Sequence, residues 1–117
     1  MIRKKVMLVI TVTTLFNNTV MAQKHKSVLN SKDIAQGEAL INKSDCSSCH
    51  QLNDRFIGPG YAEIAKKYKP TPANIEYLSN KIIKGGKGIW GTTPMAPHPV
   101  LTKAESKKIV NYILTVK

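Results

Sequence analysis

The chain contains one C-x-x-C-H string, Cys46-Ser47-Ser48-Cys49-His50, which holds both cysteines of the 117-residue sequence. Two thiols at this spacing lie about one helical turn apart, which suits the two vinyl groups on one edge of a haem. A histidine directly after the second thiol lies close under the porphyrin, where its imidazole can bind the iron. The string is the attachment signal of c-type haem. It therefore predicts that Cys46 and Cys49 form thioethers to one haem c and that His50 is an axial ligand.

Other uses of a C-x-x-C pair stay open on the string alone. In an exported protein the two thiols can form a short disulfide or act as a thioredoxin-like redox pair. The redox pair is expected within an α/β pattern, and the sequence around the string has none. A structural zinc site needs a second pair of ligands, and the chain has no second cysteine pair to supply it.

The first 22 residues have the features of a secretory signal peptide. A basic segment at residues 3–5 precedes an apolar run at residues 6–16 and a small-residue cleavage site at residues 20–22. An uncleaved membrane anchor is the alternative, but the run is shorter than the roughly 20 apolar residues that span a bilayer. Covalent haem attachment in bacteria occurs outside the cytoplasm, so the leader agrees with the string. Both predict a periplasmic protein, cleaved after about Ala22, without a transmembrane anchor.

Residues 23–117 then form a single domain of 95 residues. A core this small usually needs a further stabilising link, which a covalently held haem would supply. Without the leader, 15 basic residues face 7 acidic ones, a net charge of +8. A basic surface suits nucleic acid, an anionic membrane or an acidic protein. Outside the cytoplasm, and without a nucleic-acid-binding motif, nucleic acid is disfavoured, and many of these lysines can simply be solvated surface. With a haem in the chain, we expect redox proteins with acidic docking surfaces as partners, and a monomer.

The domain is predicted to be all-α, with a flexible lead-in at residues 23–32 before a haem-binding domain at residues 33–117. Asp33 can cap a first helix that runs to about Lys43, and a second helix is expected at residues 61–68. Thr71 followed by Pro72 starts a third helix, and the Thr102–Glu105 capping box starts a last one that runs to about residue 116. No segment alternates over the length of a strand, so residues 87–99 are expected to be irregular.

Periodic apolar residues indicate which helical faces lie inward. The predicted inward positions are Ile34, Leu40, Ile41, Ile75, Leu78, Ile82, Ile109, Ile113 and Val116. Gly37 interrupts the first helix at a cost of about 1 kcal/mol relative to alanine. Such a glycine is tolerated where another helix must pack closely against it.

The loop after His50 contains a Gly-Pro-Gly turn at residues 58–60. A histidine that binds metal needs its second ring nitrogen fixed by a hydrogen-bond acceptor. The carbonyl of Pro59 is placed to be that acceptor, although an ordinary turn proline explains the pattern equally well.

Elimination suggests the second axial ligand. Met95 is the one methionine that remains after the leader is removed, and it lies in a proline-rich loop at residues 93–97 rather than on a helix face. A stiff loop can present a single side chain to a metal. His98, three residues further on, is the rival donor, and His25 in the lead-in is a poor candidate. Met95 is therefore favoured over His98.

The sequence resembles the short class I cytochromes c of bacteria, of the c-five-fifty-one type, over residues 33–117. The matching segments, in order, are Cys46-Ser47-Ser48-Cys49-His50, Ile57-Gly58-Pro59-Gly60-Tyr61, Ile82-Ile83-Lys84-Gly85-Gly86, Gly88-Ile89-Trp90-Gly91, Thr93-Pro94-Met95-Ala96-Pro97 and the closing helix. This resemblance implies about four helices wrapped around one haem. It also implies that His50 and Met95 are the axial ligands and that the Pro59 carbonyl bonds His50.

The resemblance further implies that Trp90 bonds a haem propionate. Two positions depart from the family pattern. Lys81 stands where members often have arginine near the same propionate, and His98 stands where many have an asparagine that bonds the methionine sulfur. The contacts at the propionate and at the sulfur are therefore the ones in which this chain is expected to differ.

These features together predict an electron carrier and not an enzyme. With both axial positions filled, the iron can change oxidation state but offers no site for substrate, and the sequence contains no other catalytic constellation. We expect it to pass single electrons between respiratory proteins, with Lys43, Lys66, Lys67, Lys84 and Lys87 around the exposed haem edge. Two alternatives are the haem subunit of a larger dehydrogenase, for example a sulfite-oxidising one, and a haem-based ligand sensor.

Overall fold

Four α-helices, one 3-10 turn and a two-stranded hairpin make up residues 28–117, the part of the chain that this computed structural model describes. In order they are α1 (Ser31–Lys43), η1 (Cys46–Ser48), α2 (Tyr61–Lys67), α3 (Pro72–Lys84), β1 (Gly86–Gly88), β2 (Gly91–Met95) and α4 (Lys103–Ile113). The mainly helical prediction is confirmed. The predicted signal peptide and most of the lead-in lie outside the described residues. Within residues 28–117, no helix has the length and apolar character needed to cross a membrane.

The start of α1 differs from the prediction by three residues. The helix begins at Ser31, because the side-chain oxygen of Asn30 accepts a hydrogen bond from the Asp33 backbone N–H at 2.8 Å. Asparagine and aspartate cap helices about equally well. Asp33 instead lies in the first turn, where its negative charge faces the positive end of the helix dipole.

The predicted starts of α3 and α4 are confirmed. The Thr71 hydroxyl accepts from the Asn74 backbone N–H at 3.2 Å, and proline occupies the first turn of α3. At α4 the capping box is complete, with Thr102 and Glu105 each accepting from the backbone N–H of the other. The helix ends at Ile113, three residues earlier than expected.

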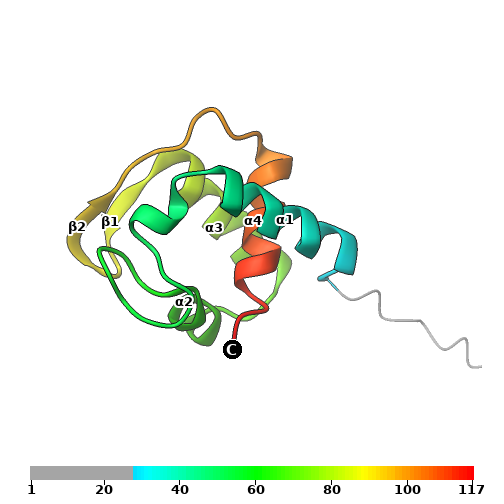
Figure 1. Cartoon of the computed structure of the whole chain (residues 1–117), viewed down its shortest axis with the longest axis horizontal. Helices are drawn as coiled ribbons and strands as arrows, with labels where there is room; N and C mark the ends of the chain where they lie inside the picture. Colours follow the sequence, from blue (N-terminus) through cyan, green and yellow to red (C-terminus); the bar gives the residue numbers. More distant parts are fainter. Residues whose placement is uncertain (1–27) are drawn as a thin grey trace, which may run out of the picture.

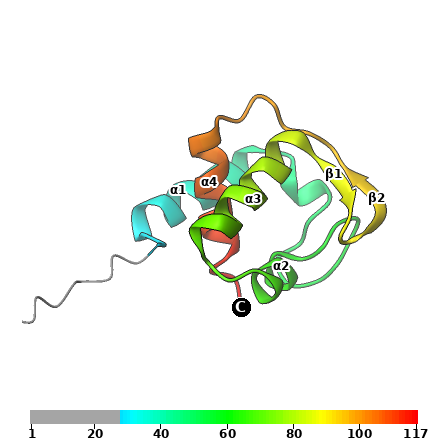
Figure 2. The same cartoon turned by 180° about the vertical axis from the view of Figure 1, so that it is seen from behind.

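Helices α1, α3 and α4 form the packed side of the domain, and the hairpin and α2 lie away from the α1–α4 crossing (Figures 1 and 2). Gly37 lies where α1 meets α4, and a Cβ at this position would overlap the backbone oxygen of Lys108. The expectation that Gly37 serves close helix packing is therefore confirmed.

The buried apolar core lies mainly on the inner faces of these helices. It consists of Ile41, Tyr61, Ile64, Ile75, Ile82, Ile109, Val110, Ile113 and Leu114. Five of the predicted inward residues belong to it, and Leu40, Leu78 and Val116 pack against it. Ile34 is half-buried and is not among the residues packed on this core.

The hairpin corrects the prediction that residues 87–99 are irregular. Strands β1 and β2 pair antiparallel, with Gly86 opposite Met95 and Gly88 opposite Gly91. The alternation that reveals a strand depends on one face being buried, and here nearly every strand residue is exposed. Gly88 and Gly91 have φ values of 115° and 124°, which residues with a side chain rarely adopt. The hairpin places Met95 at the inner end of β2.

Candidate cofactor site

A cavity of about 370 Å³ lies between the C-x-x-C-H segment, the loop before α2, helix α3, the hairpin and α4. Its volume falls in the range of about 300–1,000 Å³ that is usual for cofactor and ligand sites. Core residues such as Ile82, Ile109 and Val110 form part of its wall. All the predicted site residues line it: Cys46, Cys49, His50, Pro59, Lys81, Trp90 and Met95. Sequence reasoning therefore named residues that the fold brings to one cavity.

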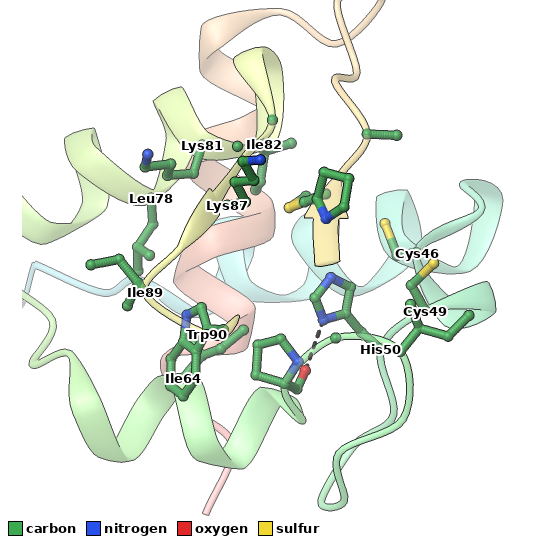
Figure 3. Close-up of a pocket in the computed structure, with 18 of the residues that line it drawn as sticks. Cys46, Cys49, His50, Ile64, Leu78, Lys81, Ile82, Lys87, Ile89 and Trp90 are labelled. Carbon is green, nitrogen blue, oxygen red and sulfur yellow. Dashed lines mark hydrogen bonds between the residues drawn. The ribbon is translucent and has the colours of Figure 1, made fainter. Parts of the chain in front are cut away.

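The C-x-x-C-H segment forms a tight turn around one carbonyl group. The backbone N–H groups of Cys49 and His50 both donate to the Cys46 oxygen, at 3.1 and 2.9 Å. This geometry places both thiols and the imidazole on the same side of the cavity (Figure 3). Neither cysteine is in a disulfide. Burial, followed by the nearby Asp45 carboxylate, raises the pKa of the Cys46 thiol.

The His50 ring is held from three sides. Its Nδ1 lies 2.7 Å from the Pro59 carbonyl oxygen, the contact dashed in Figure 3, and this oxygen can only accept a hydrogen bond. The proton is therefore on Nδ1, which leaves the Nε2 lone pair free to bind a metal. A Cβ on Gly58 would lie 2.6 Å from the His50 Cε1, and the Tyr61 ring stacks at 5.8 Å between centroids. The ring thus has little freedom to turn.

Met95 is positioned by the end of α3. Gly85 follows that helix with φ of 68°, and a Cβ there would overlap the Met95 backbone oxygen. Together with the pairing of Met95 opposite Gly86 in the hairpin, this close approach fixes the backbone from which the thioether extends. Met95 is partly buried and packs against the core.

Trp90 lies at the tip of the hairpin and is held by a residue that sequence reasoning missed. The Arg55 guanidinium donates to the Trp90 carbonyl oxygen at 3.0 Å and lies 5.5 Å from the centre of its ring. Arg55 also pairs with Glu63 at 3.3 Å, and Glu63 accepts from the Gly60 backbone N–H at 2.8 Å. This series of contacts links the loop before α2 to the hairpin. An arginine in a loop without secondary structure gives no sequence signal for such a contact.

Of the five lysines predicted to surround the exposed haem edge, only some lie near the opening of the cavity, which we call the rim. Lys87 lines the cavity, and Lys67 lies 5.8 Å from the Trp90 ring. Lys66 instead lines a separate hollow beside the C-terminal residues, and Lys43 and Lys84 do not line the cofactor cavity. Two lining residues that were not predicted, Ile57 and Ile89, are 51% and 57% exposed. The rim therefore combines positive charge with apolar surface.

His98, the rival axial donor, also lines the cavity. Its Nε2 lies 3.0 Å from Oδ1 of Asp45, which leaves only Nδ1 without a described partner. His25 lies outside the described residues.

The residues of the cavity fit a haem. An apolar wall is combined with two thiols, one imidazole nitrogen free for metal and one thioether. Within residues 28–117, the buried Tyr61 hydroxyl and the His98 Nδ1 have no hydrogen-bond partner, which is unusual for buried polar groups. Burial also raises the pKa of the Tyr61 hydroxyl. A flat apolar group with polar edges would cover this surface.

Fold and site together define a small helical protein that holds one haem covalently, a c-type cytochrome. The family model for cytochrome c matches residues 34–117. The chain is 44% identical to cytochrome c-552 of Hydrogenobacter thermophilus over 68% of its own length and 81% of that protein. It is 37% identical to cytochrome c-551 of Azotobacter vinelandii over 69% of its own length and 98% of that protein.

A solved structure gives the same result. The crystal structure of Nitrosomonas europaea cytochrome c552 superposes with a TM-score of 0.63 at 36% identity, covering 68% of this chain and 99% of that one. The chain belongs to the class I cytochromes c, of the c-551 and c-552 type. It carries one covalent haem c and is an electron carrier rather than an enzyme. The disulfide, thioredoxin-like and zinc interpretations of the cysteine pair are therefore wrong.

Proposed function

We propose that His50 and Met95 are the two axial ligands of the haem iron and that Cys46 and Cys49 form the thioethers. The observation that carries this proposal is the 2.7 Å contact between His50 Nδ1 and the Pro59 oxygen, which leaves Nε2 free in the cavity that Met95 also lines. His98 remains the rival donor, because it lines the same cavity and its Nδ1 has no described partner, but its loop is restricted by Pro97 and Pro99.

The haem, when bound, supplies one-electron chemistry. The chain's part is to occupy both axial positions, so that no substrate reaches the iron, and to keep water from most of the cofactor with the apolar wall. A methionine opposite a histidine raises the reduction potential. We therefore infer a carrier of high potential, exported by the leader at residues 1–22, which works as a monomer between periplasmic respiratory proteins.

This proposal can be tested on the exported protein by mass spectrometry and visible spectroscopy. We expect the mass of the chain from Gln23 onward plus one haem, and a low-spin spectrum in both oxidation states. A mass equal to the bare chain would contradict covalent attachment. Carbon monoxide binding to the resting ferrous protein would favour the sensor alternative, and a stoichiometric partner on purification would favour the dehydrogenase subunit.

Electron transfer to an acidic redox partner should slow as salt is added. Lys87 at the cavity and Lys67 beside Trp90 would attract an acidic surface, and exposed charges are screened beyond about 10 Å at 0.1 M salt. Stopped-flow rates at increasing ionic strength measure the effect. Lys87→Gln should weaken the salt dependence more than Lys66→Gln, since Lys66 lies at the separate hollow beside the C-terminus. Rates independent of salt would assign docking to the apolar rim instead.

A further inference from the structure

One side-chain contact joins the two segments that supply the haem ligands. The Nε2 atom of His98 lies 3.0 Å from Oδ1 of Asp45, across 53 positions in the sequence. Asp45 directly precedes Cys46, and His98 follows Met95 by three residues. The contact thus links the C-x-x-C-H segment to the loop that leaves Met95.

The backbone of His98 is fixed as well. Its N–H lies 3.1 Å from the Ile82 oxygen and 3.2 Å from the Ile83 oxygen at the end of α3, and its own oxygen accepts from the Leu101 N–H at 3.2 Å. Prolines on either side restrict the backbone further. Only the side chain of His98 reaches across to the C-x-x-C-H segment. That side chain is 20% exposed, whereas Asp45 is 76% exposed.

Met95 therefore lies between two fixed points. On one side the hairpin pairs Met95 opposite Gly86, and on the other only two residues separate it from His98. Because the connection is short, movement of His98 away from Asp45 would also move the backbone of Met95 and its thioether. Movement of Met95 away from the C-x-x-C-H segment is opposed by the same contact.

We propose that Asp45 and His98 form a clasp that keeps the Met95 loop closed over the C-x-x-C-H segment and so holds the Met95 sulfur on the iron. Both are positioning residues that act through Met95, and the inference rests on the proposed axial ligation by Met95. Neither Asp45 nor His98 is a proposed iron ligand. Removing their contact should therefore weaken the hold on Met95 while Met95 itself stays in place as the ligand.

The test is imidazole binding to the ferric holoprotein, because imidazole binds iron only where Met95 has moved away. Because the Asp45 carboxylate is largely exposed, its contact with His98 contributes little, and we expect Asp45→Ala to tighten apparent imidazole binding by only about fivefold. His98→Ala should do the same, and the double variant should bind no more tightly than either single one, since both remove one interaction. Asp45→Asn keeps an oxygen acceptor for Nε2 and should bind imidazole nearly as weakly as the parent.

The matched control is Asp54→Ala, which removes one exposed carboxylate of the loop before α2 that takes no part in the Asp45–His98 contact. It should leave imidazole affinity unchanged. Effects of Asp45→Ala and His98→Ala that simply add in the double variant, or no effect of Asp45→Ala, would overturn the clasp. A parent protein that lacks the sulfur-to-iron charge-transfer absorption would instead refute Met95 ligation itself, so the two failures are distinguishable.

Discussion

Met95→Ala should open the sixth position of the iron and lower the reduction potential. The thioether favours the ferrous state, so its loss stabilises the ferric one. His98 is a poor replacement, because Pro97 and Pro99 restrict its loop and the end of α3 holds its backbone N–H. We therefore expect an open or water-bound iron, which binds carbon monoxide when ferrous and gains slow peroxidase activity.

The weak sulfur-to-iron charge-transfer absorption at the near-infrared edge of the ferric spectrum measures this change. Met95→Ala should abolish it. His98→Ala should keep it and shift the potential only modestly, and the double variant should resemble Met95→Ala. If Met95→Ala retained this absorption and the parent's potential while His98→Ala lost six-coordination, His98 would be the ligand and the argument for a high potential would be wrong.

Gly37→Ala should lower the free energy of unfolding by about 1–3 kcal/mol, the usual range for overpacking a close contact. The added Cβ would overlap the Lys108 backbone oxygen, and backbone yields less easily than a flexible side chain. Helices α1 and α4 would have to separate. Denaturant unfolding of the holoprotein, followed by far-ultraviolet circular dichroism, measures the change.

The sign of this effect separates packing from helix propensity. Alanine is favoured over glycine within a helix by about 1 kcal/mol, so propensity alone predicts that Gly37→Ala is stabilising. Ala39→Gly is the matched control, because Ala39 is an exposed residue of the same helix. It should destabilise by about 1 kcal/mol through propensity alone. A gain in stability with Gly37→Ala would mean that α1 and α4 separate without appreciable cost.

Local chemistry made part of this molecule predictable. The C-x-x-C-H string and the caps at Thr71 and Thr102 each depend on a few neighbouring residues, and each was found where the sequence placed it. Asn30 was missed because it and Asp33 are comparable caps, and the choice between them depends on tertiary packing.

Other contacts between distant segments were not predictable. The hairpin lacks a buried face, and the Arg55 contact with Trp90 joins residues 35 positions apart without a pattern in either segment. The Asp45–His98 contact is of the same kind. Nothing in the sequence distinguishes Ile57 and Ile89 from other apolar residues, although in the structure both are exposed and line the cavity. Single-sequence periodicity carries no information on such pairs.

The turn around the Cys46 carbonyl has a consequence for the order of maturation. Its hydrogen bonds, from Cys49 and His50 to Cys46, lie within five consecutive residues, so the turn can form in a chain that is otherwise unfolded. Met95 comes 45 residues after His50 and reaches the cavity only once a long loop has closed. Enzymes that join the cofactor thus need a short nascent segment, not a finished domain. If Met95 binds the iron as proposed, capture of its sulfur then belongs to the final, slower stage of folding.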